Sequence, residues 1–429
     1  MARRRRPLTS LSAASLLWMV HAAGAAAQEP TSVRLGGTAV GLWTRAQPAV
    51  AGDGLSELYL TQPMLFAHAT LPGGWLDARV TLNFEGVTLR DGELAAGNAG
   101  EGYVDRRHPH TYLHEAVLVA RAPPWRGFDT SLTVGRGFAP FGTDDPMVRP
   151  FTKYPANHHL AQLLERLIVV GAVRRGPIAL EAGVFNGDEP MRPDDVGRLD
   201  RFGDSWSARA TVRPMDGIEL QASRAFVASP EHAFGRGLDH SKWSASARFE
   251  ALAPAGIALY GLLEWARTDE ADRGQRFFTF ESALAEVAAR RDGWETALRL
   301  ERTTRPEEER SGDPFRSTRP HTHTNIVGIT RWTSVTGRVG RTFGTRWTLE
   351  PFIEASRHAV RSTVGNVFDP IEQFGSDRLW NLSLGVRVGV GAQHARMGRY
   401  GVALAAPHPA HGPADRSTTS ATTGSHEDD

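Results

Sequence analysis

The chain has 429 residues, with 49 Lys and Arg against 48 Asp and Glu, and it contains no cysteine. Without cysteine the chain has no disulfides, thiol nucleophiles or cysteine-based metal sites. The two charges nearly balance, and the sequence has no clustered excess of positive charge, so no nucleic-acid partner is expected.

The N-terminus has the three parts of a secretory signal peptide. Arg3 to Arg6 form a basic region, Leu11–Ala23 is mostly apolar, and small residues follow up to Ala27. An uncleaved membrane anchor is disfavoured, because the apolar run falls well short of the ~20 residues that span a bilayer. We therefore expect residues 1–27 to be removed. The loss of four arginines leaves 45 basic against 48 acidic residues, a net charge of −3.

The rest of the chain is predicted to form strands. Sixteen segments read as strands, in the order Val33–Thr44, Glu57–Thr70, Leu76–Leu89, Tyr112–Arg121, Asp129–Gly137, Leu167–Arg175, Pro177–Asn186, Ser205–Arg213, Ile218–Val227, Ser241–Ala251, Ile257–Arg267, Arg276–Ala288, Trp294–Thr303, Asn325–Arg338, Arg346–His358 and Leu379–Gln393. Most are ~9–14 residues long, whereas ordinary strands have ~5–6 residues and membrane-spanning strands need ~9–11.

The best of these segments alternate cleanly between an apolar and a polar face. In the tenth segment, the side chains at every second position from Trp243 to Phe249 are apolar, and those at the positions between and beside them, from Lys242 to Glu250, are polar. Successive side chains of a strand point to opposite faces, so one face of the sheet is apolar and the other charged. The first, second, fourth and sixth segments alternate poorly.

The connections between the segments alternate in length. Short turns such as Pro214–Gly217 follow the even strands, and longer loops follow the odd strands. Bacterial outer-membrane barrels have this layout, with short periplasmic turns and long extracellular loops. Within hydrocarbon only helices and closed barrels satisfy every backbone N–H and C=O. We predict an all-β fold, a closed antiparallel transmembrane β-barrel of about 16 strands. A soluble β-sandwich or propeller would have shorter strands and no such rhythm.

The leader, the sixteen strands and the eight long loops, of which the third is the longest, resemble the general and phosphate-type porins of Gram-negative outer membranes. The resemblance covers nearly the whole mature chain and rests on architecture, without a short diagnostic motif. It implies an outer-membrane protein in contact with lipid, a third loop (residues 138–166) that folds into the lumen and narrows it, and a homotrimer. Porins usually end on an aromatic residue that closes the last strand.

This chain departs from that pattern at its C-terminus. We place the barrel at residues 28–405 and predict a disordered periplasmic tail at residues 406–429, which is poor in apolar residues. The departure puts in doubt whether Tyr400 ends the barrel. In the third loop, the spacing of Leu160, Leu163, Leu164 and Leu167 predicts a short helix, with Asn157 as its N-cap. An apolar face on this helix would pack against the barrel wall.

Charges that point inward by the alternation would set the selectivity of a channel. Eleven acids and seven bases meet that description, Glu281 among the acids, and we leave the sign of the selectivity open. The alternative is that facing Arg and Glu side chains pair across strands and brace the wall. The candidate pore-lining or constriction residues are Asp144, Asp145, Arg149, Lys153, Arg79, Glu85, Arg209, Arg248, Glu264, Glu295, Arg299, Glu350 and Arg387.

Several histidines fall in the predicted loops and make a second candidate site. His108 and His110 lie in the second loop, His114 lies at its edge in the fourth segment, and His158 and His159 lie in the third loop. Two imidazoles with a carboxylate hold Zn²⁺ or another borderline cation, and these loops would be neighbours at the barrel mouth. The alternative is that the histidines only brace the loops, since their spacing matches no established zinc motif.

The sequence therefore favours a porin-like channel for passive diffusion of small hydrophilic solutes or ions, with no catalysis and no obligatory cofactor. A metal-binding or metal-responsive barrel that uses the loop histidines is one alternative. A barrel enzyme or adhesin with a plugged lumen is another. No hydrolase signature or phosphate-binding loop is visible.

Overall fold

The computed structural model describes residues 31–50, 52–88, 110–156, 158–190, 192–232, 235–308, 326–363, 368–392 and 396–403. Within these ranges the chain forms sixteen strands, each at the place that the sequence predicts. Their bounds are β1 (Ser32–Val50), β2 (Asp53–Thr70), β3 (Leu76–Asn83), β4 (Leu113–Trp125), β5 (Phe128–Gly137), β6 (Arg166–Arg175), β7 (Ile178–Asn186), β8 (Phe202–Met215), β9 (Ile218–Val227), β10 (Asp239–Ala253), β11 (Ile257–Asp272), β12 (Gln275–Arg291), β13 (Trp294–Glu308), β14 (Ile326–Arg341), β15 (Trp347–Ser362) and β16 (Arg378–Gly391).

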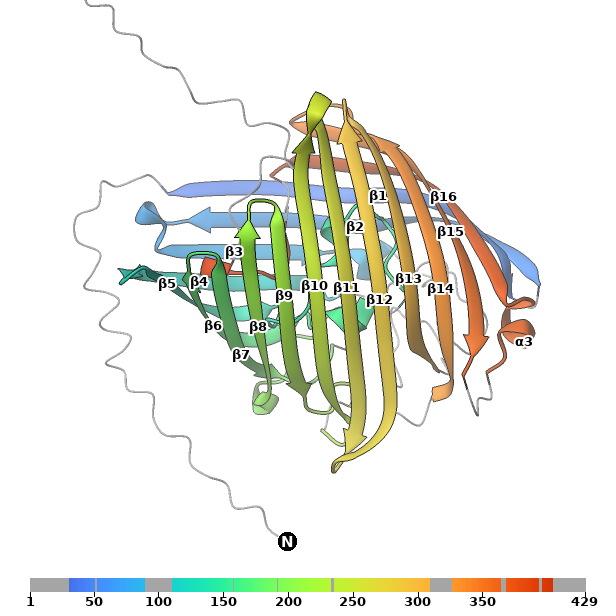
Figure 1. Ribbon diagram of the computed structural model, residues 1–429, viewed down its shortest axis with the longest axis horizontal. Helices are drawn as coiled ribbons and strands as arrows, with labels where there is room; N and C mark the ends of the chain where they lie inside the picture. The colour runs from blue at the N-terminus through green and yellow to red at the C-terminus, as the bar shows by residue number, and fades with distance from the viewer. Residues whose placement is uncertain are drawn as a thin grey trace, which may run out of the picture.

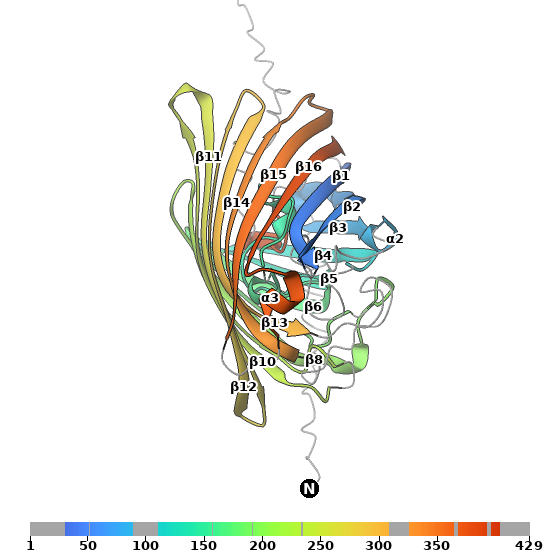
Figure 2. The ribbon, with the colours of Figure 1, turned by 90° about the vertical axis from the view of Figure 1, so that its right-hand side faces the viewer.

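The strands close into a single antiparallel barrel. Every strand pairs with its neighbours in sequence, and β1 also pairs with β16, for example Val40 with Arg387. Figure 1 shows the blue strands β1–β3 crossing behind β10–β14, and Figure 2 shows the wall from the side. Such crossing is the tilt that closure of a sheet requires. The predicted fold is therefore confirmed.

Among the described residues, two short helices and several 3₁₀ turns interrupt the connections. The helices are α2 (Glu85–Thr88) and α3 (Pro370–Phe374). None of the helices in the described ranges is both long and apolar enough to cross a membrane. Connections of two to five residues follow the even strands β2 to β14, and connections of 11 to 29 residues follow six of the odd strands, which defines a short-turn end and a long-loop end of the barrel. The longer loops that the sequence predicts after the first and eleventh segments are two-residue connections, 51–52 and 273–274, because the strands on both sides of them are longer than predicted.

Side chains divide between the two faces of the wall as the alternation predicts. In β3, Asp77, Arg79 and Thr81 are buried toward the interior, while Val80 between them is exposed on the outside. Large apolar side chains remain exposed along the outside of most strands, and Trp75, Trp125, Trp265, Trp294, Trp347 and Trp380 are among them. The barrel thus has an apolar outer face and a mostly polar inner face.

Three sequence predictions about local structure are wrong. β3 ends at Asn83 and not at Leu89, so Glu85 lies in α2 and not in a strand. As a result the connection of residues 84–112 is one residue longer than that of residues 138–165, and the third loop is not the longest. The predicted leucine helix is a single 3₁₀ turn, His158–Ala161, and Leu167 already belongs to β6. Its proposed N-cap, residue 157, lies outside the described residues.

Candidate functional site: the barrel interior

The connection of residues 138–165, here called loop 3, crosses the interior of the barrel. Near its start, Gly142 donates its N–H to Ser223 Oγ of β9 (3.0 Å) and accepts from Gln221 Nε2 (2.6 Å). Further on, Arg149 Nη2 donates to Glu264 Oε2 of β11 (2.9 Å). The backbone N–H groups of Thr152 and Lys153 donate to the carboxylate of Glu354 on β15 (2.8 and 3.1 Å). Loop 3 is therefore bonded to opposite parts of the wall.

Apolar contacts hold loop 3 at three places. Phe151 packs among Tyr260, Leu262 and Leu284 of β11 and β12. Met147 and Tyr154 pack on Met64 and Phe66 of β2. Leu160 and Ala161 pack on Ala266 and Phe280 of the same wall as Phe151. The packing against the wall that the leucine pattern predicts is thus present, although its predicted helix is not.

Residues 396–403, here called the C-terminal segment, also lie inside the barrel. They follow β16, whose last residue Gly391 is at the short-turn end. The Arg399 guanidinium binds Glu219 Oε1 (2.7 Å), and Arg209 Nη2 donates to the carbonyl of Gly398 (2.9 Å). Arg213 Nη2 donates to the carbonyl of Ala403 (2.9 Å). The segment is fixed to the inner face of β8 and β9 by these charged contacts.

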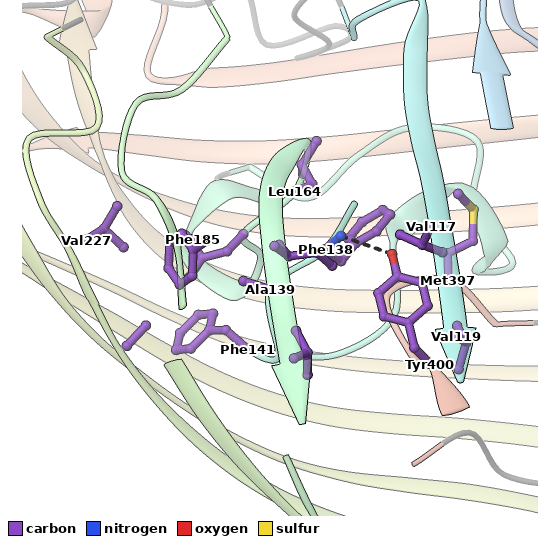
Figure 3. Close-up of a cluster of buried hydrophobic side chains, with 14 residues drawn as sticks. Val117, Val119, Phe138, Ala139, Phe141, Leu164, Phe185, Val227, Met397 and Tyr400 are labelled. Carbon is purple, nitrogen blue, oxygen red and sulfur yellow. Dashed lines mark hydrogen bonds between the residues drawn. The ribbon is translucent and has the colours of Figure 1, made fainter. Parts of the chain in front are cut away.

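An apolar cluster joins the C-terminal segment to loop 3 and the wall. Tyr400 is buried and its hydroxyl donates to Glu115 Oε2 (2.9 Å) while it accepts from the N–H of Phe138 (3.0 Å). Figure 3 shows Tyr400 and Met397 beside Phe138 and Val117, with Phe141 and Phe185 together on the other side of the strand drawn between them. This half of the interior is a packed core.

Asp144 of loop 3 is the charged junction of the two segments. Its carboxylate binds Arg396 Nε (2.6 Å) of the C-terminal segment and Arg248 of β10, and Arg399 Nε lies 3.7 Å away. Burial alone would raise the pKa of Asp144, but these guanidinium groups hold it below its usual value. Asp144 therefore stays ionised and links loop 3 to the C-terminal segment.

Charged side chains of the inner wall pair directly across neighbouring strands. Glu181 on β7 makes a two-pronged pair with Arg209 on β8, at 2.6 and 2.7 Å. Arg299 Nε donates to Glu286 Oε1 (2.7 Å), and Arg338 bridges Glu295 and Glu350 (2.7 and 2.6 Å). The bracing of the wall by facing Arg and Glu columns is thus observed. Glu286, and not the predicted Glu281, faces inward on β12, because Phe280 and Leu284 also face inward there to contact loop 3.

A cavity of about 210 Å³ remains in the interior between loop 3, the C-terminal segment and the wall. Met147 and Val148 of loop 3 and Met397 line one side of it. The charged residues that line it are Arg149, Arg248, Arg290, Glu295, Glu350 and Arg387. Four arginines against two glutamates give this cavity a positive balance.

The thirteen candidate pore residues all lie at the interior. Five of them line the cavity, namely Arg149, Arg248, Glu295, Glu350 and Arg387. The others make contacts that hold loops and strands: Asp144 and Arg209 bind the C-terminal segment, Lys153 and Glu264 anchor loop 3, and Arg299 pairs with Glu286. Asp145 caps the turn at Met147, Glu85 accepts from Thr61 and Gln62, and Arg79 donates to the carbonyl of Arg399.

Comparison with solved structures follows this geometry. The anion-selective porin from Comamonas acidovorans superposes with a TM-score of 0.50 at 13% identity, over 84% of this chain and 99% of that one. The fold is that of a porin. OmpT of Vibrio cholerae (TM-score 0.45, 11% identity, 84% of this chain and 100% of that one) and OccK2 of Pseudomonas aeruginosa in complex with glucuronate (0.42, 11%, 84% and 99%) are also similar. No protein-family model and no curated protein sequence matches the chain.

Two of the predicted histidines meet beside loop 3 of this porin-fold barrel. His110 and His114 point their Nδ1 atoms at Glu165 Oε1, at 3.4 and 2.8 Å. Burial alone would lower the pKa of His110, but the hydrogen bond and charge of Glu165 raise it to about 9. Glu165 was missed at the sequence level, because nothing in its spacing links it to residues about 50 positions earlier. His108 lies outside the described residues, as do the side chains of His158 and His159.

A serine–histidine–asparagine group on the porin wall has the wrong polarity for nucleophilic catalysis. Lys153 Nζ donates to Asn381 Oδ1, so the amide nitrogen of Asn381 donates to His358 Nε2 (3.1 Å). The proton of His358 is then on Nδ1, which faces Ser334 Oγ at 2.8 Å. A histidine that donates to the serine does not take its proton, as a general base must.

Proposed function

We propose that the protein is an outer-membrane channel for passive diffusion of small hydrophilic solutes, which loop 3 narrows and the C-terminal segment closes further. The observation that carries the proposal is the combination of a sixteen-stranded closed wall with two internal segments that are bonded to it. Sixteen strands enclose a lumen wide enough for an aqueous channel. The segments that fill it are then the parts that control passage.

The Gram-negative outer membrane is the location that this wall fits. An apolar outer face with tryptophans, on a barrel without an open sheet edge, suits a lipid environment. Export by removal of residues 1–27 and a homotrimeric assembly remain expectations of the same proposal.

Leu263→Arg tests the lipid-facing wall. Leu263 is 61% exposed near the middle of β11, so the substitution is expected to lower the free energy of unfolding in bilayers by about 2–4 kcal/mol. Leu252→Arg, at a side chain that is 70% exposed but near the end of β10, is the control and should cost only about 0–1 kcal/mol. Denaturant unfolding of both variants in lipid vesicles measures the difference. Equal costs at the two depths would contradict the membrane assignment.

Conductance across a planar bilayer tests the channel directly. The mature protein is expected to give stable, ohmic steps that are small for a sixteen-stranded barrel, because loop 3 and the C-terminal segment occupy part of the lumen and bound the cavity of about 210 Å³. The cavity lining carries four arginines and two glutamates, so reversal potentials in a KCl gradient should favour chloride. A folded, inserted barrel that gives no measurable conductance, even without its C-terminal segment, would contradict the channel proposal.

The catalytic and adhesive alternatives gain no support among the described residues. The polarity of the Ser334–His358 pair disfavours nucleophilic chemistry there. The filled interior is equally expected of a closed channel. Metal binding has an observation of its own and is argued next.

A further inference from the structure

His110, His114 and Glu165 form a buried cluster where loop 3 rejoins the wall. His110 lies near the end of the connection of residues 84–112, His114 lies on β4, and Glu165 directly precedes β6. None of the three side chains is more than 3% exposed. We propose that this cluster binds a borderline divalent cation such as Zn²⁺. The inference does not depend on the channel proposal, because binding can be measured on a barrel that does not conduct.

The distances suit a shared ion. Zinc–nitrogen and zinc–oxygen bonds are about 2.0–2.2 Å, so two ligands of one tetrahedral ion lie about 3.3–3.5 Å apart. His110 Nδ1 and Glu165 Oε1 are 3.4 Å apart, and His114 Nδ1 is 2.8 Å from the same oxygen. The three ligand atoms all lie within 4.8 Å of one another. Opening the shorter contact by about half an ångström would bring both histidine–glutamate distances into this range.

The chemistry of the donor set is also that of a metal site. Two imidazoles, which bind the ion in their neutral form, and a carboxylate are ligands that zinc prefers, and such a set leaves a fourth position for water. The bound ion takes the place of the proton that His110 shares with Glu165. The Tyr154 hydroxyl lies 3.3 Å from His110 Nε2, and the N–H of Thr111 donates to Glu165 Oε1 (2.9 Å). Partners of this kind orient metal ligands in known sites.

The backbone at Glu165 is strained in a way that serves the cluster. Glu165 has φ of 58°, in the left-handed region that residues with a side chain rarely adopt. This conformation places its carboxylate at both imidazoles while the chain enters β6 at Arg166. Strain of this kind persists where surrounding contacts impose it, and it gathers at functional sites.

Metal binding by the full-length mature protein, purified in detergent, tests the proposal. Titration calorimetry with Zn²⁺ compares wild type with His114→Gln and Glu165→Gln. Each variant should bind one equivalent of Zn²⁺ fewer than wild type does. His358→Gln is the matched control, a buried wall histidine outside the cluster, and should bind as wild type does. A second group, Glu231, His240 and Glu270, lies at the long-loop end. Binding there would appear equally in all four proteins. Equal stoichiometry in all four would overturn the proposal and leave the cluster as a buried ion pair.

A measurement on unaltered protein keeps the test decisive if either variant fails to fold. Folding is checked by the heat-dependent gel mobility typical of barrels. Co²⁺ in a tetrahedral site of nitrogen and oxygen ligands gives strong visible absorption, unlike the weak bands of the octahedral aqueous ion. Wild type should therefore develop a visible band on addition of one equivalent of Co²⁺, and Zn²⁺ should remove it. The octahedral spectrum alone would contradict a site of this geometry.

Discussion

Deletion of residues 396–429 is expected to raise the single-channel conductance at least about twofold over that of the full-length protein, because a sixteen-stranded lumen is wide enough for an aqueous channel and the deletion removes one of the two segments that occupy it. The C-terminal segment packs against Phe138 of loop 3 and lines the cavity through Met397. Its removal uncovers the inner faces of β8 and β9, to which the segment is bonded. Planar-bilayer recordings of both proteins measure the change.

The charges of the segment also predict a change in selectivity. Arg396 and Arg399 neutralise Asp144 and Glu219, so their loss leaves two carboxylates with fewer partners. The reversal potential in a salt gradient should therefore shift toward cations in the truncated barrel. Since the pKa of Asp144 is depressed, its pairs are complete above the ordinary value of 3.8 and weaken only as the pH falls through the lower folded value. The segment is therefore expected to stay in place at neutral pH.

Two controls separate the effect of the segment from effects of shortening the chain. Deletion of residues 404–429 keeps the segment and should leave the conductance unchanged. The double substitution Arg396→Glu and Arg399→Glu in the full-length chain sets like charges against Asp144 and Glu219, and should raise the conductance as the deletion does. An assembled truncated barrel with the conductance of wild type would show that the segment does not obstruct the pathway.

The wall itself was predictable because its physics is local. Strand length, the alternation of side chains and the rhythm of short and long connections are all written in consecutive residues, and each of the sixteen strands was placed correctly. The poor alternation of the first, second, fourth and sixth segments has one physical reason. Their inner faces carry apolar residues, such as Leu42, Met64, Val117 and Ile168. These side chains pack against other wall residues, against loop 3 or against the C-terminal segment, so they do not face water.

The arrangement of the interior was less predictable because its contacts join distant residues. The prediction that Glu281 points inward was wrong. On this part of β12 the apolar side chains point inward to loop 3, so the polar side chains between them point outward. Glu165 and the C-terminal segment carry no local signal of their partners. Tyr400, an aromatic residue near the expected end of a barrel, lies within the interior and not in the last strand.

Phe151→Ala in the truncated barrel is expected to release the middle of loop 3, giving larger and fluctuating conductance steps. Phe151 is fully buried between the loop and β11–β13, and the Arg299 guanidinium lies 4.2 Å from its ring centroid. Truncation of a buried phenylalanine costs about 3–5 kcal/mol. This cost falls on the docking of loop 3, because the strand pairing of the wall does not involve Phe151.

The same reasoning gives the control and the contrary result. Phe277→Ala removes an equally large ring from the outside of β12, where it touches no part of loop 3, and should leave the steps unchanged. Glu354→Gln weakens the other central anchor, since Glu354 accepts from the N–H groups of Thr152 and Lys153, and should act in the direction of Phe151→Ala. Steady steps of unchanged size in both loop variants, with barrels that keep their gel mobility, would mean that loop 3 does not set the width of the pathway. The constriction would then lie among the wall arginines that line the cavity, and their substitution would be the change that alters conductance.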